Sequence, residues 1–146
     1  MEKERNILEE NKIAIDTGVF IEYIEKTRYG KKFKNSVLMD PGINEYHISP
    51  LVETELNYLF CRKWGDKQGF LMVKKMLTGY SIQSESYLRE EASRFKCKYP
   101  ISLSDCYSLS VAKLKTIPIY FKMEEELDTN FDALSEEVEI RFIDFL

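Results

Sequence analysis

The chain has 146 residues, a length that suits one domain with one hydrophobic core. Hydrophobic residues make up 44% and charged residues 32%, a balance typical of globular proteins, and no apolar run approaches the roughly 20 residues that span a bilayer. The net charge of −4 argues against a general nucleic-acid coat but does not exclude an enzyme that acts on RNA or DNA. We expect a single cytoplasmic domain over residues 1–146, in which residues 1–11 form a charged, flexible lead-in without the apolar core of a signal peptide.

The cysteines and the single histidine exclude several kinds of site. Cys61, Cys97 and Cys106 are widely spaced and form no CxxC pair, so a structural zinc site or a disulfide framework has little support. His47 stands alone, which argues against a serine or cysteine hydrolase triad, and we expect it to be an ordinary polar residue of a strand. The scattered glycines form no phosphate-binding loop. Any chemistry must therefore come mainly from carboxylates.

Short apolar runs alternate along the chain with longer segments of helical periodicity. Strands are predicted at 13–15, 46–49, 80–82, 117–121 and 138–143, and helices at 18–26, 50–64, 69–77, 84–97 and 102–115. Ser49 and Pro50 form a strong helix start, while residues 35–45 are weakly patterned. Strands that alternate with helices imply a mainly parallel central sheet with helices on both faces, which is a three-layer α/β/α sandwich.

Four acidic side chains are predicted at one edge of this sheet. Asp16 ends the first strand and Glu124 follows the fourth, and the carboxyl ends of parallel strands share one edge. Glu55 lies near the start of the helix that follows the second strand, although periodicity alone does not choose between Glu55 and Glu53. Asp105 opens the helix before the fourth strand and needs only a loop that returns to this edge.

A simpler interpretation treats two of these acids as helix caps. Asp16 precedes a helix, and Ser102 followed three residues later by Asp105 matches a capping box. This interpretation does not explain Glu55, because a carboxylate at the edge of an apolar helix face costs free energy without a partner. The residues alone leave both interpretations open.

Converging carboxylates without histidine or cysteine define a site of hard oxygen ligands. Such a site suits Mg²⁺ or Mn²⁺, and clustered carboxylates repel one another strongly when no cation is bound. The chemistry that needs this arrangement is hydrolysis of a phosphodiester, in which the metal activates water and neutralises the developing charge.

A basic segment at residues 26–34 is the second candidate for function. It contains five positive charges and two aromatic residues in nine positions, the charges being Lys26, Arg28, Lys31, Lys32 and Lys34. One interpretation is a loop that follows a nucleic-acid backbone with help from stacking. The alternative, with even weight, is a solvated loop followed by a helix start.

Three segments carry a resemblance to a known family. They read Ile-Asp-Thr-Gly-Val-Phe at 15–20, Ile-Ser-Pro-Leu-Val-Glu-Thr-Glu-Leu at 48–56, and Leu-Ser-Asp-Cys-Tyr-Ser-Leu-Ser-Val-Ala at 103–112 followed by Ile-Pro-Ile-Tyr-Phe at 117–121. In their order and spacing they resemble the PIN-domain family, whose small members include the VapC-type ribonuclease toxins. The resemblance covers roughly residues 12–143.

The resemblance assigns roles to the four acidic residues. Asp16 matches the first aspartate of the family pattern, Asp105 matches the third acidic motif, and Glu55, directly before Leu56, matches the Glu-Leu of the second motif. The fourth motif commonly has Thr or Ser, one further residue, and Asp. Here Lys122-Met-Glu stands at 122–124, which makes Glu124 the best match, with Glu126 as the reserve.

The resemblance implies a Mg²⁺- or Mn²⁺-dependent endoribonuclease that forms a homodimer. Thr17 and the basic segment would then contact RNA, and in a toxin a small antitoxin protein would cover the acidic site. The altered fourth motif and the acidic net charge favour an alternative, a catalytically weak or inactive binding or scaffold protein with the same fold.

Overall fold

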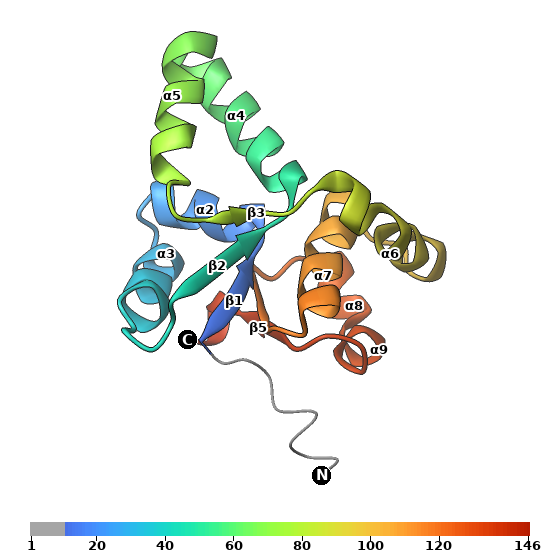
Figure 1. Cartoon of the computed structure of the whole chain (residues 1–146). Helices are drawn as coiled ribbons and strands as arrows, with labels where there is room; N and C mark the ends of the chain where they lie inside the picture. The colour runs from blue at the N-terminus through green and yellow to red at the C-terminus, as the bar shows by residue number, and fades with distance from the viewer. Residues whose placement is uncertain (1–10) are drawn as a thin grey trace.

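The computed structural model describes residues 11–146, so the predicted lead-in lies almost entirely outside the described residues (Figure 1). A parallel sheet of five strands has the order β3-β2-β1-β4-β5 and confirms the predicted fold class. The strands are β1 (Lys12–Ile15), β2 (Glu45–Ile48), β3 (Ser81–Ile82), β4 (Ile119–Phe121) and β5 (Ile140–Phe142). The first strand of the chain is therefore the central strand of the sheet.

Helices cover both faces of this sheet (Figure 1). They are α2 (Thr17–Ile24), α3 (Arg28–Phe33), α4 (Pro50–Trp64), α5 (Asp66–Met76), α6 (Glu85–Lys98), α7 (Leu103–Lys115), α8 (Glu125–Thr129) and α9 (Phe131–Ser135), with a π-helical turn at Lys34–Leu38 and a 3₁₀ turn at Ile143–Phe145. All five predicted helices form. The π turn and the short helices α8 and α9 were not predicted, because five residues are too few to show a helical period, and α3 was predicted only as a possible helix start.

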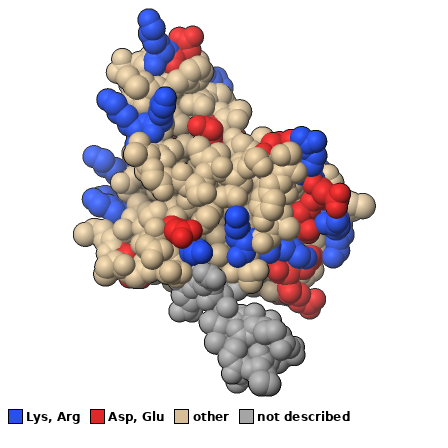
Figure 2. Space-filling model, in the orientation of Figure 1, with Lys and Arg blue, Asp and Glu red and all other residues tan. Residues whose placement is uncertain are grey.

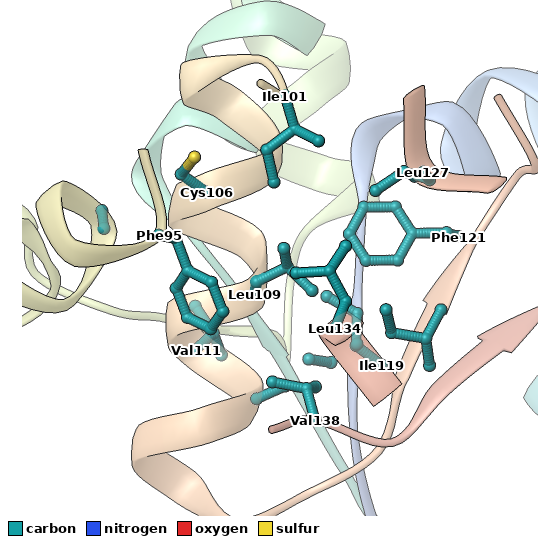
Figure 3. Close-up of a cluster of buried hydrophobic side chains, with 14 of the residues drawn as sticks. Phe95, Ile101, Cys106, Leu109, Val111, Ile119, Phe121, Leu127, Leu134 and Val138 are labelled. Atoms are coloured by element: carbon teal, nitrogen blue, oxygen red, sulfur yellow. The ribbon is translucent and has the colours of Figure 1, made fainter. Parts of the chain in front are cut away.

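The central strand is buried on both faces, as a strand between two helical layers must be. Ile13 and Ile15 belong to the core beneath α2, α3, α4 and α5, whereas Ala14 belongs to the core beneath α6, α7, α8 and α9. In the second core, Phe95 of α6 and Leu109 of α7 lie toward Phe121 of β4 (Figure 3). Three small residues of α7 are fully buried: Ser108, Ser110 and Ala112.

The helices α4 and α5 form a hairpin that projects from the sheet (Figure 1). Gly65 joins them with a φ of 84°, and α5 begins at Asp66, three residues earlier than predicted. The Asp66 carboxylate accepts a hydrogen bond from the Lys67 amide (2.7 Å) and stabilises this early start. Within residues 11–146 no helix has both the length and the apolar character needed to cross a bilayer.

Gly30 allows α3 to lie directly on the last turn of α2. A β-carbon at this position would lie 2.0 Å from the carbonyl oxygen of Glu22, which is backbone and cannot move aside. We therefore expect Gly30→Ala to lower the free energy of unfolding by about 1–3 kcal/mol, measured by urea denaturation. Lys32→Ala changes an exposed residue of the same helix and should stay within about 0.5 kcal/mol of the parent. Equal stability of the two variants would contradict this account of the contact.

Candidate acidic active site

The four predicted carboxylates surround one pocket of about 240 Å³. It lies where β1, β2 and β4 end and where α2, α4, α7 and α8 begin, which is the edge expected for a site in a parallel sheet. The lining residues are Asp16, Thr17, Gly18, Ile21, Glu55, Ser102, Ser104, Asp105 and Glu124. Neither Glu53 nor Glu126 is among them.

Asp16 is buried at the end of β1, with only 4% of its surface exposed. Its Oδ2 accepts the amide of Gly18 (3.3 Å) and so caps α2, while its Oδ1 accepts the hydroxyl of Ser108 (2.7 Å). Burial raises the pKa of Asp16 to about 6 against the lowering effect of these two bonds, and the charge of Glu55 raises it further. The capping interpretation is therefore right for Asp16 but incomplete, because a second bond comes from a helix 92 residues away.

Asp105 lies in the first turn of α7 and is not explained by capping. The hydroxyl of Ser102 accepts the amide of Asp105 (3.1 Å), which is one half of the predicted capping box. The carboxylate oxygen Oδ2 of Asp105 is buried and has no hydrogen-bond partner within residues 11–146. Burial, followed by the charges of Asp16 and Glu124, raises the pKa of Asp105 to about 8. A buried oxygen without a partner costs free energy unless a ligand occupies the space in front of it.

Glu55 is held by two hydroxyl groups. Thr17 (2.6 Å) and Ser104 (2.7 Å) both donate to the same oxygen, Oε1, so Oε2 takes no part in these two bonds. The two donors come from α2 and α7 and fix the carboxylate between those helices. This geometry distinguishes Glu55 from Glu53, which periodicity alone could not do.

Glu124 stands at the rim of the pocket just before α8. Burial raises its pKa, the charges of Glu126 and Glu55 raise it further, and Lys122 lowers it. Asp144 holds the backbone that leads to Glu124, since it accepts the amide of Met123 (2.9 Å) and the ammonium of Lys122 (2.7 Å). Lys122, which stands where the fourth motif usually has Thr or Ser, is therefore paired with Asp144.

The residues around the pocket fit a hard divalent cation in kind. Their polar side chains are carboxylates and hydroxyls, none of them offers a nitrogen or sulfur ligand, and Asp105 presents an unused buried oxygen. Within residues 11–146, no three Asp, Glu, His or Cys side chains approach closely enough to enclose an ion as they stand. Mutual repulsion among the carboxylates, which also raises the pKa values of Asp16 and Asp105, favours this separation.

Only some of the predicted RNA-binding residues lie close to one another. Three of them surround a second pocket at the far end of α2: Lys26, Lys31 and Lys34. The segment is helix α3 from Arg28 onward, with Thr27 as its N-cap, so it contains the helix start of the second interpretation, and contact with RNA stays a prediction. The Nη2 of Arg28 donates a hydrogen bond to the hydroxyl of Tyr29 (2.9 Å). Neither Arg28 nor Lys32 lines the pocket. Thr17 lies in the acidic pocket as a donor to Glu55.

Sequence reasoning missed three residues that support the acidic site: Ser104, Ser108 and Asp144. Ser104 and Ser108 lie one helical turn apart on the face of α7 whose hydroxyls donate to Glu55 and Asp16, and this spacing is the signal that could have found them. Asp144 has no local signal, because it meets Lys122 only through the pairing of β4 with β5. His47, as expected, is an ordinary polar residue of β2, bonded to Glu45 and Gln83 (3.0 Å each).

Comparison with known proteins agrees with this architecture. The family model for the PIN domain matches residues 13–136. No curated protein sequence matches the chain significantly.

Several solved structures share the fold. VapBC-1 from nontypeable Haemophilus influenzae superposes with a TM-score of 0.67 at 14% identity, covering 91% of this chain and 98% of that one. VapBC2 from Rickettsia felis, bound to a promoter DNA fragment, superposes with a TM-score of 0.65 at 17% identity, covering 90% of this chain and 98% of that one. VapC20 from Mycobacterium tuberculosis, a toxin that cleaves the sarcin-ricin loop, superposes with a TM-score of 0.60 at 17% identity, covering 80% of this chain and 93% of that one. With the family match spanning most of its length, the chain belongs to the PIN-domain family.

Proposed function

We propose that the protein is a divalent-metal-dependent endoribonuclease. The observation that carries this proposal is the buried, unpartnered oxygen of Asp105 in a pocket that three other carboxylates line. Membership of the PIN-domain family supports a nuclease, while the metal and the preference for RNA are part of the proposal.

Each acidic residue has a role in this proposal. Asp16, Asp105 and Glu124 hold Mg²⁺ or Mn²⁺ directly or through water, and Glu55 holds the ion or orients the attacking water. The bound ion supplies activation of water and neutralisation of charge on the phosphodiester. Thr17 and Ser104 keep Glu55 in place between α2 and α7, so that its second oxygen is available to a water molecule.

The test is cleavage of RNA by the purified protein with and without added metal. We expect hydrolysis with Mg²⁺ or Mn²⁺, loss of hydrolysis in excess chelator, and recovery when metal is restored. Cleavage that continues unchanged in chelator would overturn the assignment.

Ser104 offers a milder test of the same site. Ser104→Ala removes one of the two donors to Glu55 without removing a carboxylate, so we expect cleavage to fall about 10–100-fold while the fold is kept. Ser93→Ala, an exposed serine of α6, is the matched control and should retain full activity. Equal activities of the two variants would show that Ser104 does not position Glu55.

The proposal extends to partners. Several similar structures are toxin–antitoxin complexes, which supports a toxin role and a small antitoxin as partner. A homodimer and a cytoplasmic location stay predictions, of which the first is tested by light scattering of the purified protein. Growth arrest on expression, relieved by the product of a neighbouring reading frame, would support the toxin role, and unaffected growth would contradict it.

A second candidate is a binding or scaffold protein without catalysis. Two observations favour it: Lys122 replaces the usual hydroxyl residue, and the carboxylates stand apart. Crystals soaked in millimolar Mn²⁺ discriminate between the two. Anomalous density between Asp16 and Asp105 supports the enzyme, and absence of density favours the scaffold.

A further inference from the structure

A second pocket, of about 380 Å³, lies between the last turn of α2 and α3. Its lining residues are Tyr23, Ile24, Lys26, Gly30, Lys31 and Lys34. Three are lysines from a stretch of nine residues, and two supply aromatic or apolar surface. The proposed catalytic roles do not use this pocket, and it shares no lining residue with the acidic site.

The backbone around this pocket is firmly held. Lys26 adopts a left-handed conformation with a φ of 57° and reverses the chain between α2 and α3. Thr27 then donates its hydroxyl to the Glu22 carboxylate (2.8 Å) and accepts the amide of Gly30 (3.1 Å). With Gly30 in contact with the backbone of α2, the three lysines are carried on a fixed frame rather than on a free loop.

The lysines of this pocket are not neutralised. Within residues 11–146, Lys26, Lys31 and Lys34 form no ion pair, whereas Lys98 and Lys113 both pair with Glu137. Figure 2 shows lysine and arginine side chains along the edge of the molecule that α5 and α3 occupy in Figure 1. On a chain with a net charge of −4, this concentration of unpaired cations around one pocket favours an anionic ligand.

We propose that this pocket binds one nucleotide, its phosphate held by Lys26, Lys31 and Lys34 and its base laid against Tyr23 and Ile24. Ammonium groups bind phosphate as point charges, and an aromatic ring accepts any base by stacking. The volume falls within the range of small-ligand pockets, which begins at about 300 Å³. The ligand is either one nucleotide of a bound RNA strand or a free mononucleotide.

The position of the pocket fits a strand that also reaches the acidic site. Helix α2 connects the two, with Asp16 at its start and Tyr23 seven residues later, a separation of about 10 Å along the helix. Stacked nucleotides advance about 3.4 Å each, so the nucleotide bound here would be about three positions from the scissile phosphate. This register rests on the proposed function, whereas binding of a nucleotide does not.

The first experiment measures binding in chelator, so that no RNA is cut. Lys31→Gln with Lys34→Gln should weaken binding of a short single-stranded RNA about tenfold and reduce the slope of log K against log salt by about 1.4. The control is Lys74→Gln with Lys75→Gln, which removes the same charge from exposed positions on α5, and should weaken binding less than about threefold. Circular dichroism confirms that all variants are folded. Equal losses of RNA affinity in the two double variants would overturn the proposed pocket, because the overall charge of the protein would then explain binding.

The second experiment identifies the ligand. Amide NMR spectra are recorded with adenosine 5′-monophosphate, adenosine and inorganic phosphate, and the monophosphate should shift the amides of residues 26–34 most. Tyr23→Leu should weaken binding of the monophosphate at least about fivefold and leave binding of inorganic phosphate unchanged. Monophosphate at millimolar concentration that leaves these amides unmoved would overturn the proposal.

Competition separates the two sources of the nucleotide. Displacement of the monophosphate by RNA identifies the pocket as a strand site, and tight binding that RNA does not displace identifies a free nucleotide as the ligand. RNA that binds in this pocket but is not cut when metal is added would contradict the proposed ribonuclease activity and still support nucleotide binding in the pocket.

Discussion

Replacement of Asp105 by Asn is expected to abolish RNA cleavage and to stabilise the metal-free protein. The carboxylate is buried, one of its oxygens has no partner among the described residues, and Asp16 and Glu124 repel it. An amide of nearly the same size removes this repulsion, so the free energy of unfolding should rise by about 1–3 kcal/mol. Loss of a ligand to the ion should lower the rate of cleavage at least about a thousandfold.

The opposite directions of the two effects make this experiment decisive. Chemical denaturation in chelator measures stability, and cleavage of labelled RNA measures activity. Glu53→Gln removes a nearby carboxylate of α4 that does not line the pocket and should change neither quantity. If Asp105→Asn were less stable and still active, Asp105 would be a structural residue and the metal site would be wrong.

The stability of the metal-free protein should fall as the pH rises from about 4 to about 8. The folded-state pKa values of Asp16 (about 6) and Asp105 (about 8) both lie above the usual aspartate value of 3.8. In that window the folded state binds more protons than the unfolded state, so raising the pH favours unfolding. The contribution of these two carboxyls to stability is therefore greatest below the unfolded pKa, where both are neutral in either state.

A divalent ion should reverse this trend, because it binds the ionised carboxylates. At pH 8 a saturating concentration of Mn²⁺ should raise the melting temperature by about 5–10 °C, and at pH 5 by clearly less, since protons compete for the same oxygens. Thermal scans with chelator or Mn²⁺ at both pH values measure the difference, and Asp105→Asn should largely remove it. The same increase at both pH values would place the bound ion elsewhere.

The sequence was sufficient to predict the sheet and the edge at which the acids meet. Strands alternating with helices imply parallel pairing, and Asp16 directly follows a short apolar strand, so its position depends only on that pairing. Ser49 and Pro50 fixed the start of α4 and with it the approximate position of Glu55. These features depend on local chemistry combined with one rule of topology.

The remaining parts of the site depend on contacts between distant residues. Periodicity did not distinguish Glu55 from Glu53, whereas the hydroxyls of Thr17 and Ser104, which lie 38 and 49 residues away, do so in the structure. Asp105 matched a capping box, yet only the bond from its amide forms, since its side chain lies toward the other acids. The extent of helix α3 could not be predicted, because its six residues are held by Thr27 and Gly30 against α2 rather than by a period of their own.

The central position of β1 has a consequence for the order in which the protein can become active during synthesis. The strand leaves the ribosome first, but one of its two neighbours, β4, pairs Ile119 with Ala14, more than a hundred residues earlier. Parallel pairings at such separation form slowly, because a long loop must close before any contact is gained. The carboxylates of Asp16 and Glu124 cannot meet until β4 and Glu124 have been translated. A growing polypeptide that has not reached Glu124 therefore carries no assembled acidic pocket, and the proposed nuclease activity would appear only after that point of synthesis.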